Sequence, residues 1–342
     1  MLYKKNVEKS LKKELFKNPT SEFRGTPFWA LNSYLTKEEL CRQIDVFKEM
    51  GLGGFHLHVR TGLENEYLSE EYMELIKDTV IKAKSEEMLA WLYDEDRWPS
   101  GAAGGLVTKD EKYRSRCLFF TPFKEEKHSD IDDDWVNKKE NLIACYDVIL
   151  DSEGFLSSYK KINENDTVEG TKWYAFLELA NPSSWYNGQT YLDTLNSEAT
   201  KKFIEVTHEK YKDKVGDEFD KTIPAIFTDE PQFTRKRVLN TSHDKMDIIM
   251  PWTDKVPELY MEMYGADIFD TLPEIFWDKP DSAPSLHRYR YHDFIAELFA
   301  TSFADTVGGW CNENGIALTG HMMQEPTLNS QTAALGEAMR SY

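Results

Sequence analysis

The chain has 342 residues, of which 40% are hydrophobic and 13% aromatic, so it is not a disordered protein and can bury a large core. Its 60 acidic and 41 basic residues give a net charge of −19, which disfavours nucleic acid or an anionic membrane as a partner. The four cysteines form no CxxC pair, so neither a disulfide framework nor a cysteine metal cluster is expected.

Strands and helices alternate in the first third of the chain. Short apolar strands are expected at 27–32, 54–59 and 88–93. Thr36 and Glu39 have the spacing of a capping box, and the helix that they begin should end at Gly51. A second helix is expected from about 69 to 86. Helices between short apolar strands are typical of parallel βα units.

The alternation stops near residue 113. Two β-like runs predict a β-rich insertion over 113–180, and a stretch rich in Trp and Pro predicts an irregular insertion over 232–283. The alternation resumes with helices at about 197–215 and 287–314 and with strands that run toward Glu230 and Glu325.

Five strand–helix units predict a TIM-type (β/α) barrel that is incomplete, with 1–342 as one catalytic domain. Because a complete barrel needs eight units, we expect either a piece of a longer protein or self-association through the open barrel edge. The chain shows no secretory signal and no apolar run of about 18 residues, which predicts a cytoplasmic protein.

Two segments place a carboxylate where an apolar strand ends: Thr228-Asp229-Glu230-Pro231 and Gln324-Glu325-Pro326. A buried strand fixes the position of such a group and the following loop exposes it. Two acids of this kind indicate glycoside hydrolysis, in which one carboxyl protonates the leaving oxygen and the other activates water or attacks carbon. Like-charge repulsion from Asp229 would raise the pKa of Glu230. Alternatively, both acids are ordinary rim carboxylates that form caps or salt bridges.

His56 and His58 alternate with apolar residues and therefore point to the same face of the second strand. They are candidates for lining a sugar pocket or, together with nearby carboxylates, for binding a metal in a metal-dependent hydrolase or isomerase. His321 follows the fifth strand and is a candidate hydrogen-bond partner of a sugar hydroxyl. The alternative for each histidine is a satisfied core residue.

Asp94, Glu95 and Asp96 follow the third strand. Three adjacent acids cannot all be buried without partners, so Arg97, sugar hydroxyls or calcium should neutralise them, unless they form a solvated loop. Trp98 is a candidate platform for stacking on a sugar ring.

Several of these segments resemble glycoside hydrolase family 106, the α-L-rhamnosidase family. The matching segments are 24–32, 53–58, 92–101, 227–231 and 319–325. The Tyr-Asp-Glu-Asp…Trp-Pro-Ser-Gly string within 92–101 is the most specific of them, and the resemblance spans about 18–342. It implies a carbohydrate partner, a catalytic role for Glu325, use of calcium and an inverting reaction.

A broader likeness concerns clan-A glycosidases, which carry Asn-Glu-Pro after the fourth strand with the Glu as general acid. Glu230 takes that role here, with Asp229 in place of the Asn, whereas the second carboxylate of that clan sits on a later strand. We therefore expect a glycosidase that removes a terminal sugar, for which the family 106 resemblance implies an α-L-rhamnoside, with Glu230 and Glu325 as catalytic residues. The residues that would bind the sugar are His56, His58, Asp94, Glu95, Asp96, Trp98, Asp229 and His321. A carbohydrate-binding fragment without activity is the alternative.

Overall fold

One end of the molecule is a parallel β-sheet. The structure, a computed structural model, describes residues 9–10, 12–125, 139–280, 284–324, 326–337 and 340. Five strands pair in the order β1-β2-β3-β8-β10, and every neighbouring pair is parallel. They are β1 (Phe28–Leu31), β2 (Gly54–Val59), β3 (Leu89–Tyr93), β8 (Ala225–Asp229) and β10 (Ala317–His321). All five strands were predicted from the sequence.

The predicted TIM-type barrel is nevertheless wrong. In the described part of the chain, β1 pairs only with β2 and β10 only with β8, so the parallel sheet is open at both edges. Five other strands form a separate antiparallel sheet and do not extend the parallel one. Alternating strands and helices specify parallel pairing, but barrel closure also requires the last strand to pair with the first.

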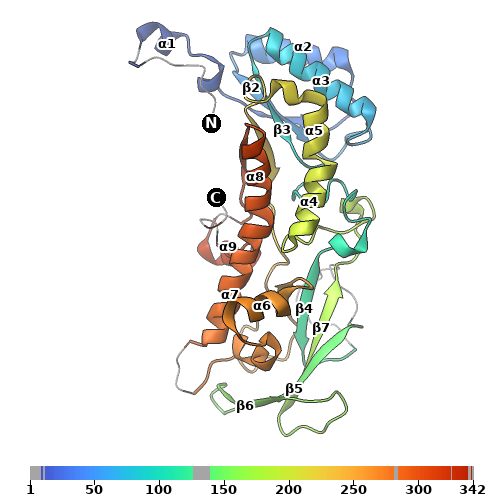
Figure 1. The fold of residues 1–342 in the computed structure, drawn as a ribbon, viewed down its shortest axis with the longest axis vertical. Helices are drawn as coiled ribbons and strands as arrows, with labels where there is room; N and C mark the ends of the chain where they lie inside the picture. Colours follow the sequence, from blue (N-terminus) through green and yellow to red (C-terminus); the bar gives the residue numbers. More distant parts are fainter. Residues whose placement is uncertain are drawn as a thin grey trace.

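Helices α2 (Lys37–Glu49) and α3 (Glu70–Ser85) lie beside one another at the end of the molecule that holds the parallel sheet (Figure 1). The hydroxyls of Thr36 and Ser69 accept hydrogen bonds from backbone N–H groups in the first turns, which confirms the predicted starts. The ring of Trp29 on β1 lies 5.2 Å from that of Phe47 on α2, so the hydrophobic core lies between this sheet face and the helices.

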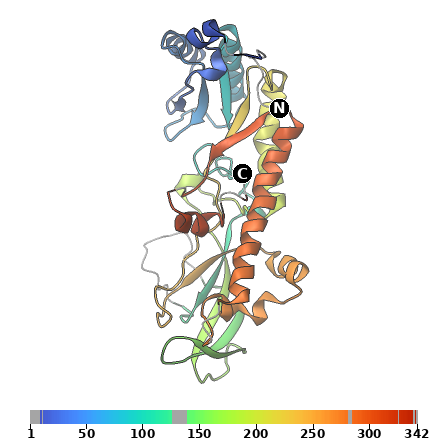
Figure 2. The same cartoon turned by 90° about the vertical axis from the view of Figure 1, so that its left-hand side faces the viewer.

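Two predicted helices are interrupted. The helix expected at about 197–215 consists of α4 (Ser197–Val206) and α5 (His208–Val215), which meet at Thr207. The helix expected at about 287–314 consists of α7 (Leu286–Phe299), the π-helix η7 (Ala300–Ala304) and α8 (Asp305–Glu313). The three segments α7, η7 and α8 follow one another without a gap. Figures 1 and 2 show that together they run along the molecule from the antiparallel sheet to the parallel one.

The antiparallel sheet has the strand order β6-β5-β7-β4-β9. Its strands are β4 (Arg116–Thr121), β5 (Leu142–Leu150), β6 (Leu156–Lys161), β7 (Thr171–Leu179) and β9 (Ile248–Trp252). Strand β9 comes from the stretch expected to be irregular, and it pairs with β4. Phe120 stacks on Trp173 and Phe276 at centroid distances of 5.1 and 4.9 Å, which gives this sheet an aromatic core of its own.

The remaining helices are short. They are α1 (Lys13–Lys17), α6 (Val256–Tyr264), α9 (Leu328–Ala334) and the 3₁₀ helices η1 (Ser21–Phe23), η2 (Glu111–Tyr113), η3 (Ser184–Tyr186), η4 (Gly216–Glu218), η5 (Ile268–Asp270) and η6 (Leu272–Ile275). Among the described helices, none combines the length and apolar composition needed to cross a bilayer.

Candidate functional site

Polar side chains gather where the parallel strands end. Because these strands are parallel, their carboxyl ends meet at one edge of the sheet, where ligands bind in open α/β sheets. His58 lies near the end of β2, Asp229 ends β8, and His321 ends β10. Asp229 and His321 are direct partners in the register of β8 and β10.

Asp229 is the centre of this cluster. Its Oδ2 atom accepts a hydrogen bond from the Tyr93 hydroxyl at 2.8 Å and lies 3.2 Å from Nε2 of His58. Its Oδ1 atom lies 3.6 Å from Nδ1 of His321. Asp229 is only 5% exposed, whereas the His321 side chain is 49% exposed and opens the cluster to solvent.

The electrostatic balance keeps Asp229 ionised. Burial by itself raises the pKa of this carboxyl, but the hydrogen bonds from His58 and Tyr93 outweigh burial, so its pKa falls below the ordinary value. Asp229 is therefore a carboxylate at neutral pH, suited to accepting hydrogen bonds from imidazole and hydroxyl groups rather than to donating a proton.

Aromatic rings surround the histidines. Phe28, which is 44% exposed, has its ring centroid 5.1 Å from that of His56, 4.8 Å from that of His58 and 5.6 Å from that of His321. His56 also stacks on Trp91 at 5.0 Å. Burial lowers the pKa of His56 to about 4, so this imidazole is neutral at physiological pH. This face of the sheet thus presents rings and neutral imidazole beside one buried carboxylate.

Of the two acids predicted to be catalytic, the structure describes only Glu230. Glu230 follows Asp229 directly, is partly buried, and donates its backbone N–H to the His321 carbonyl at 3.1 Å. Its φ of +50° is a left-handed conformation that side-chain-bearing residues rarely adopt. Strained backbone of this kind is concentrated at functional sites. Glu325 lies outside the described residues.

The acids after β3 point to three different partners. Glu95 accepts hydrogen bonds from the backbone N–H groups of Asp96, Gly101, Ala103 and Gly104, so its carboxylate holds the following loop in place. Burial raises the pKa of Glu95 to about 7. Asp96 pairs with Arg97 at 2.9 Å, and Asp94 accepts from Ser100 at 2.5 Å. No group of three potential metal ligands comes together among the described residues.

Trp98 lies against a second tryptophan. Its ring centroid is 5.4 Å from that of Trp185, whose indole N–H donates to the Trp98 carbonyl at 2.7 Å. The guanidinium of Arg97 lies 5.8 Å from the Trp185 ring. Both indoles are partly exposed, so this pair is a rigid aromatic surface close to the loop that Glu95 holds.

A polar cavity of about 450 Å³ lies just beyond this edge of the sheet. Arg60, two residues after His58, lines it together with Glu64, Asp96, Arg97 and Asn187. Asn187 accepts a hydrogen bond from Arg97 and donates one to Asp96, so one wall is held by a side-chain network. The cavity is within the size range of small-molecule sites and offers both donors and acceptors.

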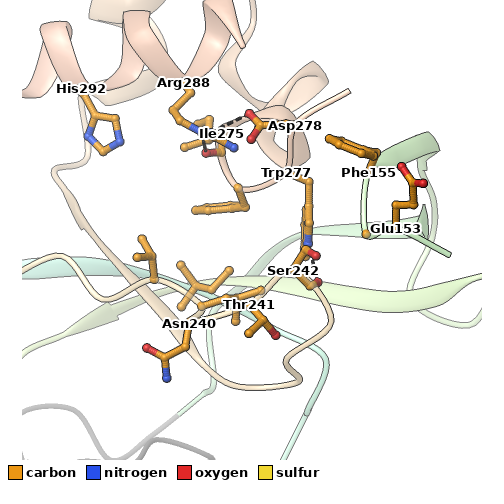
Figure 3. A pocket seen from close by; sticks show the side chains of 15 residues that line it. Glu153, Phe155, Asn240, Thr241, Ser242, Ile275, Trp277, Asp278, Arg288 and His292 are labelled. Atoms are coloured by element: carbon orange, nitrogen blue, oxygen red, sulfur yellow. Dashed lines mark hydrogen bonds and ion pairs between the residues drawn. The ribbon is translucent and has the colours of Figure 1, made fainter. Parts of the chain in front are cut away.

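A second cavity lies by the antiparallel sheet, and a third adjoins the strand ends on the β10 side. The second, of about 420 Å³, is lined by Trp277, Arg288 and His292, and Figure 3 shows these side chains between α7 and the antiparallel sheet. The third, of about 500 Å³, lies beside β10, and its lining joins His321 and Thr228 of the sheet edge to Phe299 and Phe303. Neither contains Asp229 or His58 in its lining.

Sequence reasoning missed Tyr93 and Ser100 at the site. Both contact Asp229 directly: Tyr93 through its hydroxyl, and Ser100 through its backbone and side chain. The strand alternation carried a usable signal for Tyr93, because it shares the face of Trp91 and immediately precedes Asp94. For Ser100 there was no comparable signal, since its contact depends on how the loop after β3 folds back.

Among solved structures, the chain is similar to a rhamnosidase from Novosphingobium sp. PP1Y, with a TM-score of 0.57 and 12% sequence identity. The similarity covers 93% of this chain and 48% of the rhamnosidase. The fold is rhamnosidase-like. The chain spans about half the length of that protein, and at this identity the likeness concerns the fold alone. No family model and no curated protein matches the sequence, so these comparisons do not support membership of family 106 specifically.

Proposed function

We propose that this chain carries the sugar-cleaving site of a glycoside hydrolase. The observation that carries the proposal is the carboxylate cluster at the sheet edge, where Asp229 is held by His58, Tyr93 and His321 and is followed by Glu230. The rhamnosidase-like fold supports the same reaction class. The sequence resemblance to family 106 favours a terminal α-L-rhamnoside as substrate.

In the proposed reaction, Glu230 is the general acid that protonates the oxygen of the leaving group. Asp229, His58 and His321 bind hydroxyls of the sugar ring, and His321 is the most accessible of the three. Glu325 is the candidate base or nucleophile, and an inverting reaction would have it activate a water molecule. The polar cavity beside Arg60 and Asn187 would hold the neighbouring part of the substrate.

Nitrophenyl glycosides, α-L-rhamnoside included, test the proposal. Glu230→Gln removes the transferable proton at nearly constant shape, so we expect kcat/KM to fall by about 10²–10⁴. Glu262→Gln on α6, an exposed carboxyl remote from the sheet edge, is the matched control and should hydrolyse like the wild type. Wild-type protein that turns over no glycoside, or a Glu230→Gln variant as fast as wild type, would contradict the catalytic assignment.

Sugar binding without hydrolysis is the second candidate. The open aromatic face around Phe28 and the Trp98–Trp185 pair favour it, because exposed rings stack on sugars whether or not a bond is cleaved. Binding of rhamnose or a methyl rhamnoside by calorimetry, with no turnover of any glycoside, would select this candidate over catalysis.

A further inference from the structure

A buried chain of polar side chains lies behind Asp229. The backbone N–H of Asp229 donates to the Ser100 hydroxyl at 2.7 Å, and the N–H of Ser100 donates to the Asp229 carbonyl at 2.8 Å. The Ser100 hydroxyl in turn donates to Oδ1 of Asp94 at 2.5 Å. On its other side, Asp94 places Oδ2 at 3.8 Å from Nε2 of His208. Ser100, Asp94 and His208 are all fully buried.

The hydrogen bonds around His208 fix which ring nitrogen carries the proton. The Thr207 hydroxyl has one hydrogen, which it donates to the Phe203 carbonyl at 2.8 Å. Nδ1 of His208 lies 2.7 Å from the same hydroxyl oxygen and must therefore donate to it. In a neutral imidazole, Nε2 is then an acceptor. Burial lowers the pKa of His208 to about 3, which keeps the ring neutral.

Two acceptors would therefore face each other if Asp94 were ionised. Neither Oδ2 of Asp94 nor Nε2 of His208 has a hydrogen-bond partner within the described residues. Oδ1 is occupied by the proton from Ser100, so a proton on Asp94 belongs on Oδ2, where it turns a repulsive contact into an attractive one. A buried carboxylate with one oxygen left without a donor would carry a desolvation penalty.

We infer that Asp94 is a neutral, protonated acid that donates toward His208 and, through Ser100, positions the strand end carrying Asp229. It is thus a positioning residue rather than a ligand for sugar. Any effect of Asp94 on catalysis rests on the proposed function, whereas its protonation state and its positioning of Asp229 do not.

The surroundings of Asp94 agree with this assignment. Burial raises the pKa of Asp94 well above its ordinary value, and the carboxylates of Glu95 and Asp229 raise it further. The nearby hydroxyls of Ser100 and Thr228 lower this pKa without reversing the shift. Besides these two carboxylates, His208 and the adjacent Tyr93, the titratable side chains near Asp94 are three phenols and one thiol. They belong to Tyr67, Tyr191, Tyr211 and Cys311. In the part of the chain that the structure describes, no lysine or arginine forms an ion pair with Asp94.

Asp94→Asn is the decisive variant, because an amide reproduces the neutral acid: its oxygen accepts from Ser100 and its N–H donates toward His208. We expect a protonated-carboxyl C=O band in the infrared spectrum of the wild type at pH 7 that Asp94→Asn lacks. Asp94→Ala should melt at a lower temperature than Asp94→Asn at every pH, since it removes the acceptor of the Ser100 hydroxyl and leaves a cavity beside His208.

The pH dependence of stability provides a second readout. With its folded pKa raised, Asp94 stabilises the protein fully below the unfolded pKa of about 3.9, and this contribution declines as the pH rises toward the folded pKa. The amide of Asp94→Asn does not titrate. The melting temperature of Asp94→Asn relative to wild type should therefore increase from pH 4 to pH 8.

The positioning of Asp229 by Asp94 and Ser100 can be measured through His58, which contacts Asp229. The observable is the set of NMR signals of the His58 ring nitrogens, assigned by their loss in His58→Gln. They should move in Asp94→Ala and in Ser100→Ala but stay near wild type in Asp94→Asn. If Asp94→Ala does not fold, Ser100→Ala carries this measurement. These readouts need no substrate, so a failure of the proposed hydrolysis leaves them valid.

The inference is overturned if the infrared difference shows no protonated carboxyl, or if Asp94→Asn is as unstable as Asp94→Ala at pH 7. Unchanged His58 signals in both Asp94→Ala and Ser100→Ala would overturn the positioning role. If the wild type hydrolyses a glycoside, kcat should fall in Asp94→Ala and recover in Asp94→Asn, with KM changing little.

Discussion

Both sheets bury carboxylates, but they hold them in different ways. In the antiparallel sheet, Glu178 accepts hydrogen bonds from the backbone N–H groups of Glu140 and Asn141, and Asp147 accepts from those of Glu169 and Gly170. At the edge of the parallel sheet, the partners of Asp229 are a phenol and two imidazoles.

The kind of hydrogen-bond donor distinguishes carboxylates that order a loop from carboxylates that can interact with a ligand. A backbone N–H cannot change its protonation state, so a carboxylate held by such groups serves to order a loop. An imidazole nitrogen can either donate or accept a hydrogen bond, so it can exchange its partner for a ligand. Glu95, which is held by four backbone N–H groups, belongs with Glu178 although it follows β3 at the same sheet edge as Asp229.

The largest effect should come from the aromatic core of the antiparallel sheet. Phe120 is fully buried, so Phe120→Ala should lower the free energy of unfolding by about 3–5 kcal/mol through lost contacts and a cavity. Phe28→Ala is the matched control: this ring is 44% exposed, and we expect a loss below about 1 kcal/mol. Urea unfolding of both variants measures the difference. Equal losses would show that Phe28 is packed like a core residue.

An intermediate effect is expected at Asp229. Asp229→Ala leaves the Tyr93 hydroxyl and His58 without their partner, at a cost of about 1–3 kcal/mol near pH 7. Because the folded pKa of Asp229 is lowered, its stabilisation is present above the unfolded pKa of about 3.9 and is lost as the pH falls through the folded pKa. Thermal melts from pH 7 to pH 2 should show wild type and Asp229→Ala converging.

Glu178→Ala provides the comparison with a carboxylate held by the backbone. It should cost a similar amount of stability but leave sugar binding and turnover unchanged, whereas Asp229→Ala should abolish both. Loss of sugar binding in Glu178→Ala, in a protein that is still folded, would remove the distinction between the two kinds of carboxylate.

The smallest effect concerns a buried cation. The ammonium of Lys236 is shielded from solvent without a hydrogen-bond partner in the described part of the chain, and burial lowers its pKa to about 7. Below pH 7 the ammonium is charged in both states and its burial destabilises the fold. Above pH 7 the folded protein releases the proton and the penalty shrinks. Lys236→Met should therefore stabilise by about 1 kcal/mol at pH 6 and by less at pH 10.

Melting curves at pH 6 and pH 10 measure this difference, and Lys201→Met, on the exposed face of α4, is the control. A Lys236→Met protein that is less stable than wild type at pH 6 would indicate that the ammonium has a stabilising role.

Local sequence signals identified the elements of the parallel sheet well. Thr36 and Ser69 begin helices as expected, and the alternation of His56 and His58 with Phe55 and Leu57 placed both imidazoles on one sheet face. These signals lie within a few residues of one another, where propensity and periodicity act directly.

Signals that depend on distant pairing were missed or misleading. Strand β9 has a proline within it and was expected to be irregular, yet it extends the antiparallel sheet at its edge beside β4. The sheet order and the two open edges of the parallel sheet, as far as the structure describes the chain, depend on which strands meet, and no single strand encodes that. Likewise, the divergence of Asp94, Glu95 and Asp96 follows from the loop folding back onto them, which their adjacency in sequence does not reveal.

The contact between His58 and Asp229 joins residues 171 positions apart in the sequence. Closing so long a loop costs entropy before the contact forms, so such contacts arise late in folding. A refolding chain should recover the helical signal of α2 and α3 before His58 meets its carboxylate. The cluster around Asp229 would then form late in folding, only after β8 has paired with β3.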